Sequence, residues 1–303
     1  MFACLGDHES VAGQLGEMSD MKILRKTGYV AAAAIVALSV YGYVQMRQTE
    51  ADIAAFQQTV AEIGAKAQPI SFDPDQVAEL PEPVRRYFAF SIRGPLPDYK
   101  VVRLSEEGDF RRPLTDGFEP TTAKQVIATT TPAMVFSATT PIFLGAWARA
   151  YDFYAHGEME MKAKLLSMIT VVDEKQTPEL DRISLRRWLL ESALYPQALL
   201  PGGPVRWEPV DEDSARAIVS VGDMSAKMVA HFDADGRMTS MQAEEDGDLT
   251  TPYHGSGEHV ARGDYRQVGR MMIPHSFTIS RAAKGEIHPF WIGRITAMSF
   301  DEK

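Results

Sequence analysis

The sequence is poor in cysteine and has no excess of positive charge, and each deficit excludes a class of protein. Cys4 is the single cysteine among 303 residues, so no disulfide can form within the chain and no cysteine-based zinc cluster is possible. Lys and Arg number 31 against 41 Asp and Glu, which gives a net charge of -10. Because nucleic-acid binding needs clustered cations that displace counterions, we expect no nucleic-acid partner.

Sequence motifs of common enzyme classes are also missing. The chain has no G-x-x-x-x-G-K phosphate loop and no dinucleotide fingerprint. The triplet 255-GSG-257 falls short of the G-x-S-x-G element of hydrolases, because His254 stands where a glycine is required. His254, His259, His275 and His288 lack the regular spacing of metal ligands. We therefore predict no catalytic residue, no metal site and no cofactor, and we expect the function to be non-enzymatic.

An uncharged segment near the N-terminus is long enough to cross a membrane. Residues 27–46, TGYVAAAAIVALSVYGYVQM, carry no formal charge, and a helix of that length spans about 30 Å. Basic residues lie before it within 22–26, whereas 47–52 is nearly balanced in charge. The positive-inside rule predicts a single-pass anchor with residues 1–26 in the cytoplasm and the C-terminal part, 47–303, outside it.

Two points about this segment stay open. A cleaved signal peptide needs small residues just after the apolar run, but the run ends in the Tyr-rich stretch 40–43, which favours an uncleaved anchor. The chain starts either at Met1 or at Met21, in which case residues 1–20 are an upstream extension. Cys4 follows too short an apolar run to be a lipidation site.

The segment after the anchor, 47–70, has the pattern of an amphipathic helix and linker. Four apolar residues recur at spacings of three and four: Ile53, Phe56, Val60 and Ile63. Pro69 ends the helix. Two partners are open for the apolar stripe. It packs on the outer domain of the same chain, or it self-associates through 47–66 with a second copy as a short coiled coil.

Residues 71–303 are predicted to form one extracytoplasmic antiparallel β domain. Short helices are expected within 72–90 and one long helix near 179–195. Period-two alternation and turn signals predict strands at 99–111, 121–130, 133–140, 146–155, 158–172, 205–210, 214–221, 223–233, 236–245, 258–268, 271–282 and 287–300. Strands and helices do not alternate, which disfavours a parallel sheet. The predicted fold class is mainly β (α+β), a large curved antiparallel sheet or half-barrel closed by the 179–195 helix.

The stretch 157-GEMEMKAKLLSMITVV-172 shows the alternation most clearly. Its odd residues from Met159 to Leu165 are predicted to be buried, on a face that points to a dry interior. Glu158, Glu160, Lys162 and Lys164 are predicted to be more exposed. Paired carboxylates elsewhere, such as Glu106-Glu107, are predicted to be solvated.

Methionines and one helical acid supply the candidate ligand-binding residues. The chain has 15 methionines, and this side chain suits irregular apolar surfaces, although ordinary core filling is the alternative. Glu191 lies on an apolar helix stripe with Arg187 one turn before it, so the two form a structural ion pair or hold the polar end of a ligand. The candidates are Met159, Met161, Leu165, Arg187, Trp188, Glu191, Met224 and Met228.

Four stretches resemble an uncharacterised bacterial membrane-anchored family, a domain of unknown function, over residues 75–300: 80-LPEPVRRYF-88, 187-RWLLESALYP-196, 207-WEPVDEDSARAIVS-220 with 232-FDADGRM-238, and 265-YRQVGRMMIP-274. More weakly, the order of strands and helices is similar to that of periplasmic lipoprotein-carrier half-barrels, which hold acyl chains beneath a helical lid. These resemblances imply a bacterial inner-membrane location, with the domain in the periplasm, and a lipid or other hydrophobic ligand. A scaffold or sensor module with a filled core is the alternative, and a hydrolase of unknown substrate is the third.

Overall fold

The computed structural model describes residues 8–112, 115–143, 145–247, 249 and 257–302, with side chains from Arg25 onward. Cys4 and His254, which the sequence analysis considered, lie outside the described residues. The chain divides into two compact units, Met1–Thr49 and Glu50–Lys303. The finer boundaries predicted within the N-terminal region stay predictions.

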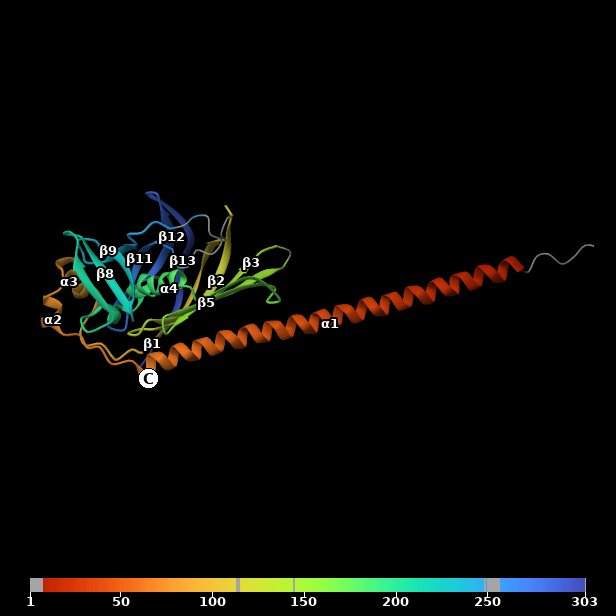
Figure 1. Ribbon diagram of the computed structural model, residues 1–303, viewed down its shortest axis with the longest axis horizontal. Coiled ribbons are helices and arrows are strands. Elements are labelled where there is room, and N and C mark those ends of the chain that lie inside the picture. Colours follow the sequence, from red (N-terminus) through yellow and green to blue (C-terminus); the bar gives the residue numbers. More distant parts are fainter. Residues whose placement is uncertain (1–7, 113–114, 144, 248, 250–256, 303) are drawn as a thin grey trace, which may run out of the picture. The chain divides into compact units, whose positions relative to one another are not determined.

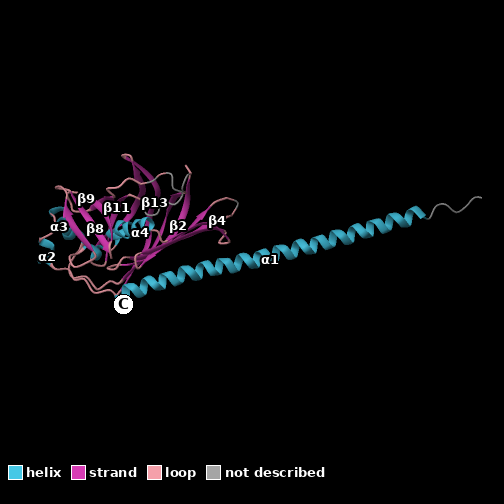
Figure 2. Ribbon diagram, viewed as in Figure 1, coloured by secondary structure: helices cyan, strands magenta, loops and turns pink. Residues whose placement is uncertain are grey.

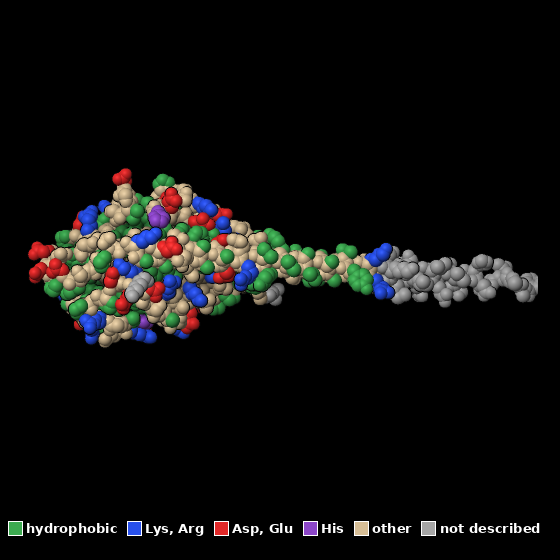
Figure 3. Space-filling view, turned by 90° about the horizontal axis from the view of Figure 1, so that it is seen from below, with side chains coloured by type: hydrophobic (Ala, Val, Ile, Leu, Met, Phe, Trp, Pro, Cys, Tyr) green, Lys and Arg blue, Asp and Glu red, His purple; other side chains and the backbone are tan. Residues whose placement is uncertain are grey.

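Helix α1, His8–Lys66, is continuous through the predicted anchor and the segment after it (Figures 1 and 2). Within the described part of the chain, its portion Arg25–Lys66 is the one helix long and apolar enough to cross a membrane, by length and composition. Hydrophobic side chains such as Val30, Ile35 and Leu38 are more than 60% exposed, and the stretch 27–46 carries no charged side chain, with basic side chains just before it (Figure 3). An exposed apolar surface of this length is unfavourable in water.

A single antiparallel sheet of 13 strands forms the body of the second unit, which confirms the predicted fold class. The strands are β1 Val101–Arg111, β2 Phe118–Ala128, β3 Ala133–Pro141, β4 Trp147–Ala155, β5 Glu158–Leu165, β6 Ile169–Lys175, β7 Val205–Pro209, β8 Ser214–Val221, β9 Met224–Phe232, β10 Met238–Gln242, β11 His259–Val268, β12 Met271–Ala283 and β13 Glu286–Asp301. Their order is β6-β5-β4-β3-β2-β1-β13-β12-β11-β10-β9-β8-β7. Two meanders therefore meet at the β1–β13 pair.

Helix α4, Pro178–Glu191, connects the two meanders and packs against one face of the curved sheet, as predicted (Figure 1). Thr177 caps its N-terminus by accepting a hydrogen bond from the Leu180 N–H, and Pro178 occupies the first turn. Trp188 and Leu189 are fully buried. The short helices are α2 Pro74–Ala78, α3 Glu82–Ser91, η1 Ser192–Leu194 and η2 Pro196–Leu199.

The last part of α1, residues 50–66, covers the opposite, outer face of the sheet. Phe56 stacks on Phe153 with ring centroids 4.2 Å apart. Val60 is fully buried in a small second core with Val126 and Val135. Of the two partners left open by the sequence, the apolar stripe thus packs on its own domain.

The predicted single strand at 158–172 is wrong, because a turn at 166–168 divides it into β5 and β6. Leu166 and Ser167 adopt left-handed φ values of 51° and 58°, and the Leu166 N–H donates to the Trp147 carbonyl at 2.8 Å. Non-glycine residues give little sequence signal for this conformation, and the alternation continues across the turn.

The predicted exposure of the outer face of β5 is also partly wrong. Lys164 is only 8% exposed. Its cross-strand neighbour Arg149 forms an ion pair with Glu50 of α1, so the outer face is covered at this point.

Candidate functional site

A cavity of about 350 Å³ lies on the α4 side of the sheet, which places it at the low end of the usual range for ligand pockets. Strands β1 to β6, β12 and β13 form its walls, and α4 contributes one side chain. Most of the lining is apolar: Phe110, Phe136, Ala138, Ile142, Ala148, Ala150, Met161, Ala163, Leu165, Val171, Val172, Ile279, Phe290 and Trp291.

A row of alanines across four strands explains why space remains here. Ala123 of β2 pairs with Ala138 of β3, which pairs with Ala150 of β4, which pairs with Ala163 of β5. The last three line the cavity. Cross-strand neighbours share one face of the sheet, so the four small side chains lie together and leave a shallow trough that larger residues would fill. The cavity thus follows from sequence and register together.

The cavity also contains one buried ion pair. Arg187 of α4 and Asp152 of β4 both line it, and their side chains are 3.0 Å apart and at most 10% exposed. Burial raises the pKa of Asp152, and the Arg187 guanidinium opposes this shift. The Arg187 Nε is buried and has no hydrogen-bond partner among the described residues, and its guanidinium lies 4.4 Å above the Phe136 ring. An apolar wall with one polar group of this kind can hold and orient an amphiphilic molecule.

The predicted pairing of Glu191 with Arg187 does not form. Glu191 instead pairs with Arg262 of β11 at 2.5 Å, and both side chains are at most 2% exposed. Arg187 turns to Asp152. Both helix residues point into the sheet, where strand residues far away in sequence offer closer partners than the next helical turn does.

A second buried network, also missed from the sequence, involves the residue of α4 just before Arg187. Arg186 and Arg281 both pair with Glu258, at 2.9 and 3.0 Å. All three side chains are less than 10% exposed.

Glu106 corrects the prediction that the Glu106-Glu107 pair is solvated. Its side chain accepts a hydrogen bond from Gln125 at 2.8 Å, and the residue is 3% exposed. Burial, together with the nearby Glu191 carboxylate, raises the pKa of Glu106 to about 7.

This shift predicts a pH-dependent stability. Between the ordinary value of 4.5 and the folded pKa of about 7, folded Glu106 keeps a proton that the unfolded chain releases. The contribution of the neutral carboxyl is therefore fully present below the lower value and is lost as pH rises through the folded pKa. We expect Glu106→Gln, which stays neutral, to gain up to about 3 kcal/mol over the parent chain between roughly pH 5 and pH 8. Melting temperature measured against pH checks this, with the half-exposed neighbour Glu107→Gln as the flat control.

The eight predicted ligand-binding residues fall into two groups. Met161, Leu165 and Arg187 line the cavity. The other five lie in the surrounding core and do not line it: Met159, Trp188, Glu191, Met224 and Met228. Sequence reasoning missed the alanine row, Phe136 and Asp152. These residues come together only through the register between strands, which the pattern of a single strand does not reveal.

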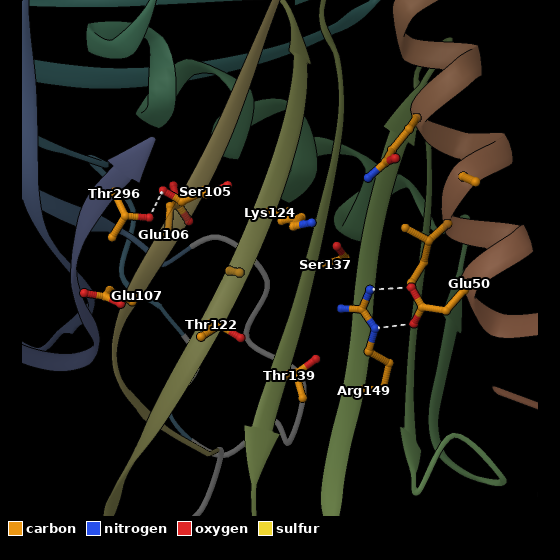
Figure 4. Close-up of a pocket in the computed structure, with 14 residues that line it drawn as sticks. Glu50, Ser105, Glu106, Glu107, Thr122, Lys124, Ser137, Thr139, Arg149 and Thr296 are labelled. Carbon is orange, nitrogen blue, oxygen red and sulfur yellow. Dashed lines mark hydrogen bonds and ion pairs between the residues drawn. The ribbon is translucent and has the colours of Figure 1, made fainter. Parts of the chain in front are cut away.

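A second hollow, of about 530 Å³, lies between residues 50–57 of α1 and the outer face of the sheet. Figure 4 shows Glu50 bound to Arg149 through two hydrogen bonds, with Thr139 on the next strand and Thr122 one strand farther away. This groove is open and polar, so it lacks the desolvated apolar surface of a small-molecule site. Among the described residues no group of three or more His, Cys, Asp or Glu side chains could hold a metal ion.

A family profile, described as a family of unknown function, DUF6920, matches residues 78–300. The chain belongs to the DUF6920 family. No curated protein matches this DUF6920 chain.

Two solved structures are similar to the DUF6920 chain. A LolA superfamily protein from Nitrosomonas europaea shares 8% identity over 66% of this chain and 86% of its own, with a TM-score of 0.35. A beta-barrel-like protein of the domain of unknown function DUF1849 from Brucella abortus shares 12% identity over 70% of this chain and 100% of its own, with a TM-score of 0.25. The resemblance to a family of unknown function is confirmed by the family profile, and the two structural similarities transfer no site and no function.

Proposed function

We propose that this DUF6920 protein is a membrane-anchored, extracytoplasmic protein that binds one hydrophobic or lipid-like molecule without chemically altering it. The observation that carries the proposal is the cavity of about 350 Å³ that is lined in part by the alanine row. Protein interiors are close-packed, and voids larger than a water molecule are few. A cavity of this size with apolar walls suits an apolar occupant.

The polar groups of the cavity narrow the class of ligand. The Arg187–Asp152 pair has no net charge when both groups are ionised, and the hydroxyls of Thr121 and Thr140 hydrogen-bond to each other at 2.8 Å. Two lining residues, Arg112 and Arg187, each keep a buried Nε donor without a partner among the described residues, and the donor on Arg187 lies in the guanidinium above the Phe136 ring. An acyl chain with a carbonyl or carboxylate oxygen that accepts from this donor satisfies both the apolar walls and the buried polar group.

The apolar part of α1 supports the membrane anchor. An exposed helix with 20 uncharged residues and a basic segment before them has the composition of a single-pass anchor. This composition supports the proposed location, in which the β domain lies on the periplasmic side of a bacterial inner membrane.

Filling the cavity tests the ligand. We expect Ala150→Phe to place a ring in the middle of the alanine row and to reduce bound lipid at least tenfold. The readout is native mass spectrometry of the full chain released from detergent, in which a ligand adds a defined mass. Ala297→Phe, at an exposed site on β13 that does not line the cavity, is the matched control. Equal added mass in both variants, or none in the parent chain, would overturn the proposal, and the latter result would favour a scaffold or sensor module.

A topology measurement tests the anchor. A reporter that is active only outside the cytoplasm, fused after Lys303, is expected to be active because the charge imbalance around 27–46 keeps the N-terminus inside. Inactivity of a stably produced fusion would place the domain in the cytoplasm and contradict the proposed location.

A further inference from the structure

Among the described residues, the three most exposed large apolar side chains of the β domain lie at the mouth of the cavity. We propose that this apolar rim, defined as Phe143, Ile169 and Val171, docks on the lipid bilayer, so that the ligand passes between membrane and cavity without crossing water. The inference rests on the proposed function and names the source of the ligand. The three side chains are 52–68% exposed, an unusual state for large apolar groups that lie close together.

Strand register places the rim at one end of the sheet. Pro141 pairs with Trp147 across the β3–β4 turn, and Leu165 pairs with Ile169 across the β5–β6 turn. The Leu166 N–H donates to the Trp147 carbonyl at 2.8 Å. These two turns are therefore directly linked, and the rim residues lie on or beside them.

The cavity opens at this same end. Ile142, next to Phe143, lines it, as do Leu165 and Val171. Val171 belongs to both the rim and the cavity wall and is 52% exposed. An occupant that covers the rim therefore meets the apolar interior directly.

The direction in which α1 runs along the outer face of the β domain favours a bilayer as the partner that covers the rim. Glu50 is held by Arg149, two residues from the start of β4 at the mouth end. The helix then runs to the opposite end of the sheet, where the Lys100 Nζ donates to the Ala67 carbonyl at 2.7 Å. The uncharged segment 27–46 ends four residues before Glu50, and four residues span at most about 14 Å. Chain connectivity thus tethers the end of the proposed anchor within this distance of Glu50, which lies at the rim end of the sheet.

An exposed apolar residue at the other end of the sheet provides the comparison. Val210 follows β7 directly and is 44% exposed. Pro209 pairs with Ala215, near the start of β8, whereas the cavity lining contains no residue of β7 or β8. Val210 is therefore expected to stay in water when the rim is docked.

Site-specific fluorescence in the full chain tests the docking. In a Cys4→Ser background, Phe143→Cys, Val171→Cys and Val210→Cys are each labelled with an environment-sensitive dye. The labelled proteins are reconstituted in vesicles of phosphatidylethanolamine and phosphatidylglycerol with and without a spin-labelled phospholipid. We expect quenching at positions 143 and 171 to exceed that at 210 at least threefold, with a blue-shifted emission.

The outcomes separate this inference from the proposed function. Equal and weak quenching at all three positions, with lipid still found on the protein by mass spectrometry, would overturn membrane docking and leave ligand binding intact. Quenching at positions 143 and 171 in a protein that carries no lipid would support membrane docking and contradict the proposed ligand binding. Strong quenching at all three positions would also contradict the proposal that the rim is the specific contact with the bilayer.

Discussion

Arg262→Met is expected to lower the free energy of unfolding by about 3–5 kcal/mol, because it leaves the Glu191 carboxylate buried without its partner. Both side chains are at most 2% exposed and lie 2.5 Å apart. Arg262 also donates to the Leu190 carbonyl at 3.1 Å, so the substitution removes a tie between β11 and the end of α4. For a domain of this size the loss corresponds to a decrease in melting temperature on the order of 10 °C.

Two further variants make this expectation specific. Arg294→Met removes an arginine whose side chain is 68% exposed and pairs with Glu107, so its effect should stay within about 1 kcal/mol. The double variant Arg262→Met/Glu191→Leu should recover most of the stability, since neither charge then remains buried alone. A single variant as stable as the parent chain would show that the pair does not hold the helix to the sheet.

Trp188→Ala is expected to destabilise the domain by about 3–5 kcal/mol. Trp188 is fully buried, packs against Tyr195 with ring centroids 5.3 Å apart, and donates its indole N–H to the Ala128 carbonyl at 3.0 Å. It does not line the cavity. This part of α4 therefore belongs to the core, while Arg187, one residue earlier, faces the ligand site.

The matched comparison for Trp188 is Trp207→Ala. Trp207 is half-buried and donates its indole N–H to the Leu199 carbonyl, so its truncation should cost clearly less. Chemical denaturation of each full-length variant measures the difference. If Trp188→Ala keeps its stability and loses bound lipid instead, α4 acts as a lid along its whole length.

Single-strand patterns were sufficient to predict most of the sheet. The Asp235-Gly236 pair marks the turn between β9 and β10, where Gly236 has a φ of 85° and a side chain would meet the Arg86 carbonyl. Alternation and turn residues are local properties, so each strand can be recognised from its own residues. Apart from the single strand predicted at 158–172, the strands and the helix at 178–191 were therefore predicted nearly at their observed positions.

The candidate site depends on the register between neighbouring strands, which cannot be derived from the pattern of a single sequence. The row Ala123, Ala138, Ala150 and Ala163 becomes a cavity only when the register of β2 to β5 aligns it. Glu106 was predicted to be solvated because carboxylate pairs were assigned to exposed strand ends or turns. An irregularity between Ser105 and Glu106 in the pairing with β13 accompanies the observed inward position of Glu106. Such an irregularity changes the local direction of side chains without a clear sequence signal.

Photo-crosslinking in living cells tests the ligand cavity most directly. Cells that produce the full chain are given a long-chain fatty acid with a photoreactive diazirine near the end of its chain, and the labelled residues are mapped by peptide mass spectrometry. A ligand in the cavity predicts crosslinks on lining residues such as Phe136 and Met161, their loss in Ala150→Phe, and their retention in Ala297→Phe. Crosslinks confined to residues 27–46, or unchanged labelling in Ala150→Phe, would contradict a ligand in this cavity.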